Sequence, residues 1–398
     1  MTRFSSAAPA WLLTCLAAAC ESPAEESDFV QTDSAGITIL ESFRPEWAEG
    51  EGWTVASEPE LAIGAGPMGG DDPNHPAFGS IRDVSVLSSG SLIVGDVTTS
   101  EVMVFDTLGL LTHKFGGKGD GPGELEDFGA VHLCAGDTII AADAYASNFF
   151  DSEGRFIRRL ATVDGETGIP LNVFLRSADC RRFLVTDDRY RTPAPEGPER
   201  LTYWVFTWTD DSFMRRDTVV RVPARHVYQY DIFTRFVPWT AHVYPIRLTG
   251  DDLVFGYSQR AELRVVAAAG DPKRILRWHA APDPITAEER RRWNEEQRVG
   301  ESGRLVQLDD FPWLPEHKAF FDRMKADDMG NLWVRALPPP DPSPERWTVL
   351  SAAGRWLGTV RMPDGFALST VARGRVYGIH RDELGVRTVR VHRLDQGG

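Results

Sequence analysis

The sequence predicts an all-β fold, a six-bladed β-propeller built from four-stranded blades, and two observations lead to it. First, with 36 glycines, 26 prolines and few long amphipathic runs, the 398-residue chain favours short strands joined by tight turns. Second, the chain repeats itself. The run IVGD ending at Asp96 aligns with IAAD ending at Asp143, 47 positions later (143 − 96), which is the spacing of a propeller blade.

Each repeat predicts four consecutive strands. An inner strand comes first, the second strand ends in aspartate, the third ends in Phe-Asp, and a glycine turn precedes the fourth. The first two units cover residues 81–116 and 130–160, and four more diverged units follow, which begin near Leu171 and include residues 251–278, 325–363 and 369–394. The last unit has only three strands, so we expect the N-terminal residues 60–64 to supply its outer strand and to close the ring.

A glycine-rich segment, residues 113–131, could be read as a phosphate-binding loop. It fits neither the phosphate-loop template nor the dinucleotide pattern, and two short strands follow it where a helix would be required. Because residues 61–84 repeat the same arrangement, both segments are interpreted as crossings from the rim of one blade to the centre of the next. We therefore expect no nucleotide cofactor.

One small helical insertion is expected between the fourth and fifth blades. Residues 283–299 have Thr286 as N-cap and Glu289 three positions later, which is a capping box. A second short helix is expected at residues 315–324.

The N-terminus indicates export. Residues 1–19 carry a single charge, Arg3, and an apolar run too short to span a bilayer, so they read as a signal peptide. The small residues before Cys20 resemble a lipobox, in which that cysteine is acylated; ordinary cleavage nearby is the alternative. We expect an acidic tether at residues 20–35, a single propeller over residues 36–398, and a lipid-anchored protein on the periplasmic or cell-surface side.

Charge and cysteine content limit the partners. A formal net charge of −15 argues against nucleic acid, and we expect a monomer. Cys134 and Cys180 remain after export into an oxidising compartment, where they could form a disulfide; the sequence leaves the pairing open.

The motifs NLWV, the Phe-Asp turn with its glycine, and above all GGKGDGPGEL resemble the six-bladed β-propeller lipoproteins of bacteria, relatives of the NHL-repeat propellers. The similarity covers about residues 28–394 and implies the fold and export more strongly than a function. A lyase related to NHL repeats holds zinc with channel histidines, so His132 and His242, near the starts of expected inner strands, are a candidate channel site. The lactonase and regucalcin propellers hold a divalent ion, but none of their ligands can be placed on this sequence, and the presence of a metal stays unknown.

The remaining candidates are carboxylates and aromatic residues. Asp96, Asp143 and Asp187 end equivalent strands and could form a metal ring, but we interpret them as caps of the following turns. In the connection YQYDIFTRFVPW, Tyr230, Arg235 and Trp239 are candidates for a binding face, because exposed aromatic residues with arginine are typical of binding hot spots. Burial between blades is the alternative.

No convergent catalytic set is visible in the sequence. We therefore predict a propeller that binds a protein, peptide or glycan through one face without turnover. The rival hypothesis is a metal-dependent hydrolase or lyase with its site in the central channel, and the joint substitution of His132 and His242 would separate the two by its effect on activity.

Overall fold

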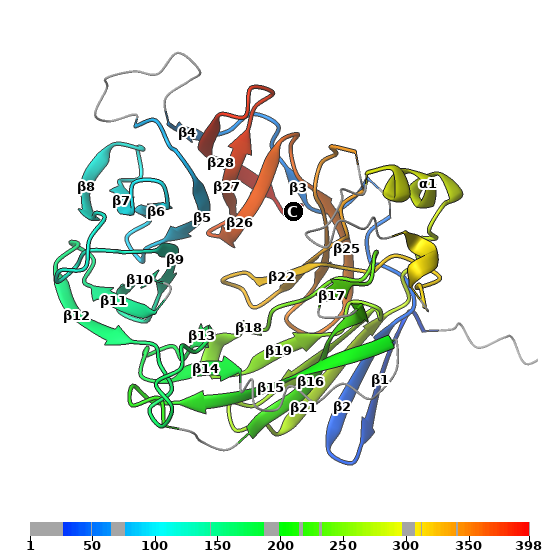
Figure 1. Cartoon of the computed structure of the whole chain (residues 1–398). Helices are drawn as coiled ribbons and strands as arrows, with labels where there is room; N and C mark the ends of the chain where they lie inside the picture. The colour runs from blue at the N-terminus through cyan, green and yellow to red at the C-terminus, as the bar shows by residue number, and fades with distance from the viewer. Residues whose placement is uncertain are drawn as a thin grey trace, which may run out of the picture.

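The computed structural model confirms the propeller: six small sheets are arranged in a ring around a common axis (Figure 1). It describes residues 27–48, 50–64, 76–143, 145–186, 199–214, 218–230, 233–296, 307–311, 313–339 and 341–397. The signal peptide and Cys20 lie outside these ranges. Within them, no helix combines the length and the apolar character that a membrane span requires.

The first three blades follow the predicted repeat. Blade 1 consists of β5 (Ile81–Val86), β6 (Leu92–Asp96), β7 (Glu101–Phe105) and β8 (Leu111–Gly116). Blade 2 consists of β9 (Phe128–Leu133), β10 (Ile139–Asp143), β11 (Ala146–Phe150) and β12 (Phe156–Ala161). Blade 3 consists of β13 (Val173–Arg176), β14 (Phe183–Thr186), β15 (Glu199–Thr209), β16 (Thr218–Tyr230) and the additional β17 (Phe233–Phe236).

The other three blades are more diverged in sequence but have the same order. Blade 4 consists of β18 (Ile246–Arg247), β19 (Leu253–Gly256), β20 (Glu262–Val266) and β21 (Pro272–Trp278). Blade 5 consists of β22 (Arg323–Ala326), β23 (Leu332–Arg335), β24 (Arg346–Leu350) and β25 (Trp356–Arg361). Blade 6 consists of β26 (Phe366–Ala372), β27 (Arg375–Arg381) and β28 (Arg387–Asp395).

The ring closes as expected, because an N-terminal strand completes blade 6. Strand β4 (Leu61–Ile63) pairs antiparallel with β28, and Ile63 lies opposite Val389. The two-residue strand β3 (Thr54–Val55) pairs with the C-terminal end of β28. The edge of the last sheet is thereby covered by the other end of the chain, which removes a site of edge-to-edge association.

The expected acidic tether, residues 20–35, overlaps a strand. Strand β1 (Phe29–Ser34) forms a hairpin with β2 (Ile37–Ser42), and β2 pairs in parallel with β21 at the outer edge of blade 4. Leu40 of this hairpin is buried in the core between blades 4 and 5. The sheet of blade 4 therefore has six strands, and strand structure is present within the segment whose acidic composition predicted a tether.

Six hydrophobic clusters hold the blades together, one between each pair of neighbours. Between blades 5 and 6 the fully buried Trp333 and Trp347 dominate, and between blades 3 and 4 Phe206 is fully buried. Because each blade contributes alternate residues to its two neighbours, both faces of every sheet are buried.

The helical insertion was predicted correctly in one of its two parts. Helix α1 (Ala287–Glu296) follows blade 4, and its capping box is formed, since Thr286 Oγ1 accepts the Glu289 N–H at 3.1 Å. The prediction of a second helix at residues 315–324 is wrong. The apolar residues of this segment reach the core from extended chain, where Phe321 and Met324 are buried.

The glycine-rich crossing lies between β8 and β9, as its interpretation required. Gly116 has φ 91°, and a Cβ there would lie 2.8 Å from the carbonyl oxygen of Ser100. Only glycine fits this position without displacing the neighbouring backbone.

Candidate functional site

The aspartates at the strand ends bind backbone rather than each other. Asp96 is buried and accepts the N–H groups of Gly79, Ser80 and Thr98 at 2.7–3.0 Å. Asp143 accepts the N–H groups of Glu126 and Asp127. Both therefore cap the chain that enters their blade, and Asp96 also caps the following turn through Thr98, which is the role that the sequence predicted. Asp187 lies outside the described residues.

The two candidate histidines lie in different surroundings. His132 is on β9, the inner strand of blade 2, whereas His242 follows β17 and packs against Trp204 and Tyr244 with ring centroids at 3.8 and 4.9 Å. In the described ranges, no group of three or more His, Cys, Asp or Glu side chains lies close enough together to hold a metal ion. The histidine pair therefore stays a hypothesis without a ligand set around it.

The expected binding face in residues 228–239 is only partly visible. Tyr230 and Arg235 belong to the paired strands β16 and β17, but their side chains lie outside the described part of the structure. Trp239 is half-buried, and its ring lies under the guanidinium of Arg290 on α1, with 5.6 Å from Cζ to the centroid. Trp239 thus connects the helical insertion to blade 4.

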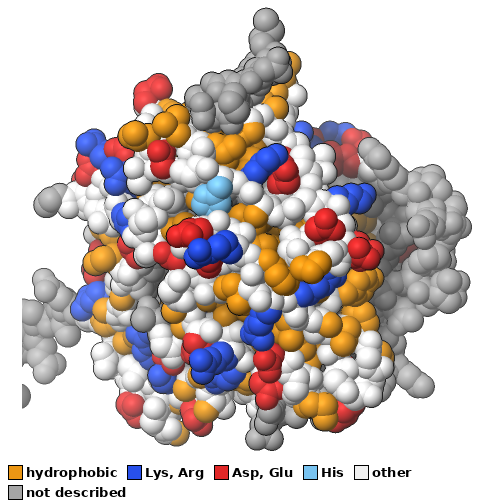
Figure 2. All heavy atoms as spheres, turned by 90° about the vertical axis from the view of Figure 1, so that its left-hand side faces the viewer, with side chains coloured by type: hydrophobic (Ala, Val, Ile, Leu, Met, Phe, Trp, Pro, Cys, Tyr) orange, Lys and Arg blue, Asp and Glu red, His pale blue; other side chains and the backbone are white. Residues whose placement is uncertain are grey.

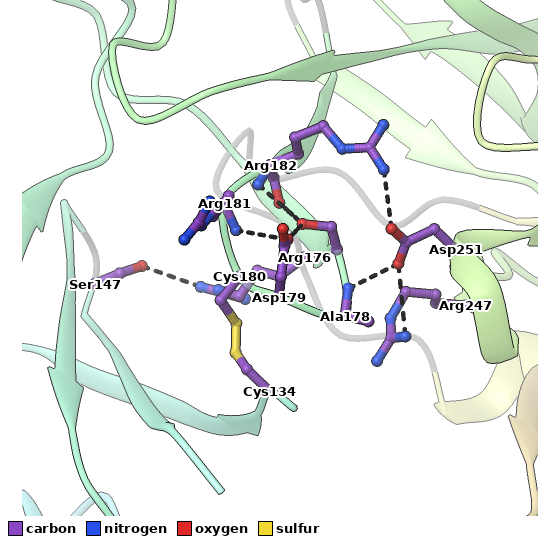
Figure 3. The surroundings of a disulfide bond; sticks show 11 residues. Cys134, Ser147, Arg176, Ala178, Asp179, Cys180, Arg181, Arg182, Arg247 and Asp251 are labelled. Atoms are coloured by element: carbon purple, nitrogen blue, oxygen red, sulfur yellow. Dashed lines mark hydrogen bonds and ion pairs between the residues drawn. A yellow bond between two sulfur atoms is a disulfide. The ribbon is translucent and has the colours of Figure 1, made fainter. Parts of the chain in front are cut away.

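Cys134 and Cys180 form a disulfide with a Cα–Cα distance of 5.7 Å (Figure 3). Each cysteine is buried in the turn that follows the inner strand of its blade, Cys134 in blade 2 and Cys180 in blade 3. The backbone supports this junction, because the Ala135 N–H donates to the Ala178 carbonyl at 2.7 Å. The disulfide therefore fastens blades 2 and 3 on the turn side of the ring, which is the face that carries the turns between the first and second strands of the blades.

The same turns are linked around most of the ring. Hydrogen bonds between these turns join four further pairs of blades. Ser88 with Asp137 joins blades 1 and 2, Ala178 with Asp251 joins blades 3 and 4, Asp328 with Arg373 joins blades 5 and 6, and Arg373 with Ser88 joins blades 6 and 1. Together with the disulfide, five of the six junctions carry such a link among the described residues. This makes the turn side of the propeller a rigid surface.

Blade 5 carries two adjoining clefts that the sequence did not reveal. One, of about 450 Å³, lies between blades 4 and 5 and is lined by Trp278, Phe320, Trp356 and Thr348 among others. The other, of about 490 Å³, is lined on one side by Trp47 and Trp53. Both have the size range of ligand-binding pockets.

The clefts meet at two exposed side chains, Arg346 and Thr359, which line both. Arg346 is the first residue of β24, and its guanidinium forms no hydrogen bond or ion pair with the residues that the structure describes. The junction therefore presents a free cationic donor between aromatic walls.

A segment from the N-terminus builds the second cleft. Residues 46 and 47 run along β25, where the N–H groups of Glu46 and Trp47 donate to the carbonyls of Trp356 and Leu357 at 3.0 and 2.8 Å. Trp47 lies against Gly358, at which a Cβ would come within 2.6 Å of the indole ring. A glycine inside a strand often marks such a close approach, and here it allows the tryptophan to form the cleft wall.

A half-buried ionic cluster lies beside the clefts in blade 5. Arg335 donates to Asp322 and to Glu345 at 2.5–2.8 Å, and Glu345 also accepts the Trp347 indole N–H at 2.9 Å. Burial opposes the charge of Arg335, but the two carboxylates raise its pKa above the usual value. Because Trp347 follows Arg346 directly, this cluster fixes the backbone from which Arg346 projects.

The high tryptophan content was the one signal for these clefts in the sequence, with 12 tryptophans in the chain. Trp47, Trp278 and Trp356 are far apart along the chain. The packing of blade 4 against blade 5 places Trp278 and Trp356 in one cleft, and the pairing of residues 46 and 47 with β25 places Trp47 in the other. No local spacing could have identified them as one site.

Comparisons with known proteins show resemblance at the level of architecture. No family model matches the chain, and no curated protein matches it. A member of the DUF4221 family from Bacteroides vulgatus is 11% identical with a TM-score of 0.48, covering 87% of this chain and 99% of its own. A proposed exported protein of Bacteroides fragilis is 11% identical with a TM-score of 0.49, covering 90% and 100%.

A gluconolactonase from Xanthomonas campestris is 12% identical with a TM-score of 0.34, covering 86% of this chain and 100% of its own. At such identities these likenesses concern architecture and assign no activity. The strand order and ring closure described above give the conclusion: the chain is a six-bladed β-propeller.

Proposed function

We propose that this protein is an exported, lipid-anchored binding propeller that holds an extended peptide or glycan across blade 5 without turnover. The observation that carries the proposal is the pair of adjoining clefts that share Arg346 and Thr359. Aromatic walls with an arginine at their centre are the composition most enriched at binding hot spots. Export and anchoring rest on the apolar residues 7–19 and on Cys20.

The geometry favours a linear ligand with acidic groups. The two clefts adjoin at Arg346 and Thr359, which line both, and Arg346 is the first residue of β24. An acidic group on the ligand would pair with the Arg346 guanidinium, which has no hydrogen-bond or ion-pair partner among the described residues. The rigid ionic cluster beside the clefts would keep the site preorganised, which lowers the entropic cost of binding.

The test is a comparison of two arginine variants on an array of glycans and acidic peptides. Arg346→Glu should weaken every specific interaction by about tenfold or more, because it places a carboxylate where the ligand needs a cation. Arg181→Glu is the matched control, since Arg181 is exposed in the turn after β13 in blade 3, lines neither cleft, and undergoes the same charge change. Equal binding by wild type and Arg346→Glu would contradict the proposal.

A further inference from the structure

Arg176 is a buried cation without a counter-charge. It ends β13, the inner strand of blade 3, with a relative exposure of 7%. Its Nη2 donates to Ser147 Oγ at 3.1 Å (Figure 3), whereas Nε and Nη1 are buried and have no hydrogen-bond partner among the described residues. Burial lowers the pKa of Arg176 to about 10, so the side chain remains charged at neutral pH.

No carboxylate compensates this charge. In the described ranges, none of the acidic residues forms an ion pair with Arg176, although arginine is seldom buried unless it is paired. A buried polar group without a hydrogen-bond partner in the protein commonly binds a water molecule or an ion. The guanidinium therefore points to a missing anionic partner.

The neighbouring residues suit such a partner. His132 and Ser147 lie on the face of blade 2 that points to blade 3, and Ala130 and Ala142 beside them have small side chains. Burial, and secondly the charge of Arg176, hold the pKa of His132 well below its usual value. The imidazole is therefore neutral at pH 7 and can still donate one N–H, while the Ser147 hydroxyl can donate its proton.

The inner strands as a group are basic, although the chain has a net charge of −15. Their ionisable residues besides His132 are one carboxylate, Asp83, and five cations: Arg82, Arg176, Arg247, Arg323 and Lys325. Two of these cations are paired, Arg247 with Asp251 at 3.7 Å and Lys325 with Asp83 at 3.9 Å, so the excess of positive charge rests on the other three. On the outer surface shown in Figure 2, by contrast, acidic and basic side chains are interspersed. An excess of positive charge near the axis makes the electrostatic potential there positive, and a positive potential attracts anions.

We propose that the wall between blades 2 and 3 is a carboxylate-binding site in which Arg176 holds the carboxylate and His132 and Ser147 donate hydrogen bonds to it. This site is independent of the clefts on blade 5. A carboxylate fits better than a phosphate dianion, because a single arginine supplies one positive charge and its planar fork matches a planar carboxylate. Most of the His132 ring is enclosed, but the residue keeps some exposed surface and lies on the inner strand of blade 2, so a ligand would approach from the axis.

The experiment uses the full-length protein in detergent, with 13C-labelled histidine and acetate as the probe at constant ionic strength. Acetate should shift the His132 resonance saturably relative to chloride and raise the pKa of that imidazole, because the anion offsets the charge of Arg176. The His132 signal is identified by its loss in His132→Gln. Arg176→Gln should weaken acetate binding by about tenfold or more, and Arg176→Lys, which keeps the charge but not the fork, should also weaken it.

Arg323→Gln is the matched control, because it removes another inner-strand arginine and should change the affinity by less than about threefold. If Arg176→Gln does not fold, Ser147→Ala replaces it, with weaker acetate binding expected and the His132 signal still observable. The proposal is overturned if acetate gives no saturable shift, or if Arg176→Gln and wild type respond alike.

The carboxylate could belong to a free small acid or to the C-terminus of a peptide. A short peptide with a free C-terminus and the same peptide with an amide are therefore titrated next. Tighter binding of the free peptide than of acetate identifies a peptide C-terminus, whereas equal affinity identifies a small acid. Binding of the amidated peptide at the same affinity would contradict recognition of the carboxylate.

Discussion

At the scale of single residues, the sequence was informative where a side chain acts on its own neighbours in the chain. Asp106 and Asp151 in the Phe-Asp turns accept N–H groups two and four positions later, as their motif indicates. His132 is different, because its pKa is lowered first by burial between blades and secondly by the charge of Arg176 from the next blade. That neighbour is 44 positions away (176 − 132) and has no local signature.

The depressed pKa of His132 predicts a pH-dependent stability. In the unfolded chain the pKa of His132 is near 6.5, and in the folded protein it is lower. At pH values between the two, the unfolded state therefore binds more protons than the folded state. The free energy of unfolding should therefore fall as pH falls below about 6.5, by at most about 1.4 kcal/mol per pH unit for this one group. Burial also lowers the pKa of His380 and His392, which act in the same direction.

Denaturant unfolding between pH 7.5 and 5 measures this slope, and His132→Gln should reduce it. Histidine-labelled NMR gives the complementary observation, in which the His132 signal should not titrate near pH 6.5. An ordinary titration of this imidazole in the folded protein would show that the inferred surroundings of His132 are wrong.

At the scale of elements, strand patterns and turn residues identified all six blades, because alternation and glycine turns are local features. The N-terminal hairpin β1–β2 was missed as part of the ring, since its choice of β21 as partner depends on where blade 4 leaves an open edge. The helix expected at residues 315–324 failed for a related reason. Burial of Phe321 and Met324 between two blades overrides the helical spacing of the apolar residues.

The disulfide between blades 2 and 3 should contribute measurably to stability. Cys134 and Cys180 are 46 positions apart, and closing a loop of that length typically stabilises the folded state by about 2–4 kcal/mol. Replacing both cysteines by serine should therefore lower the free energy of unfolding by this amount in urea denaturation. A reductant should lower the free energy of unfolding of the wild type by a similar amount and leave that of the double variant unchanged. If the reductant does not change the stability of the wild type, the proposed role of the disulfide is contradicted.

At the scale of the whole molecule, the ring brings the two ends of the chain together and gathers basic residues on its inner strands. The N-terminal strand β4 completes the sheet that ends the chain, so the ring is closed by residues more than 300 positions apart (389 − 63). The inner strands are basic within an acidic protein. A membrane anchor near the N-terminus would leave this closed disc free to present its clefts.

Anchoring through Cys20 is tested by fractionation of cells that express the protein. Cys20→Ser should release the protein from the membrane fraction, because several acyl chains on that cysteine are needed for stable attachment. The Cys134→Ser and Cys180→Ser double variant is the control and should remain with the membranes. Persistent membrane association of Cys20→Ser would contradict the anchor.

The sequence by itself determined the propeller, the number of blades, the strand that closes the ring and the capped helix between blades 4 and 5. Each of these follows from periodicity, turn chemistry or capping, which act over a few residues or repeat at a fixed spacing. Only the tertiary structure decided the clefts around Arg346 and the unpaired Arg176, because both depend on which side chains of different blades meet. Such contacts between distant parts of the chain leave no spacing in the sequence from which they could be read.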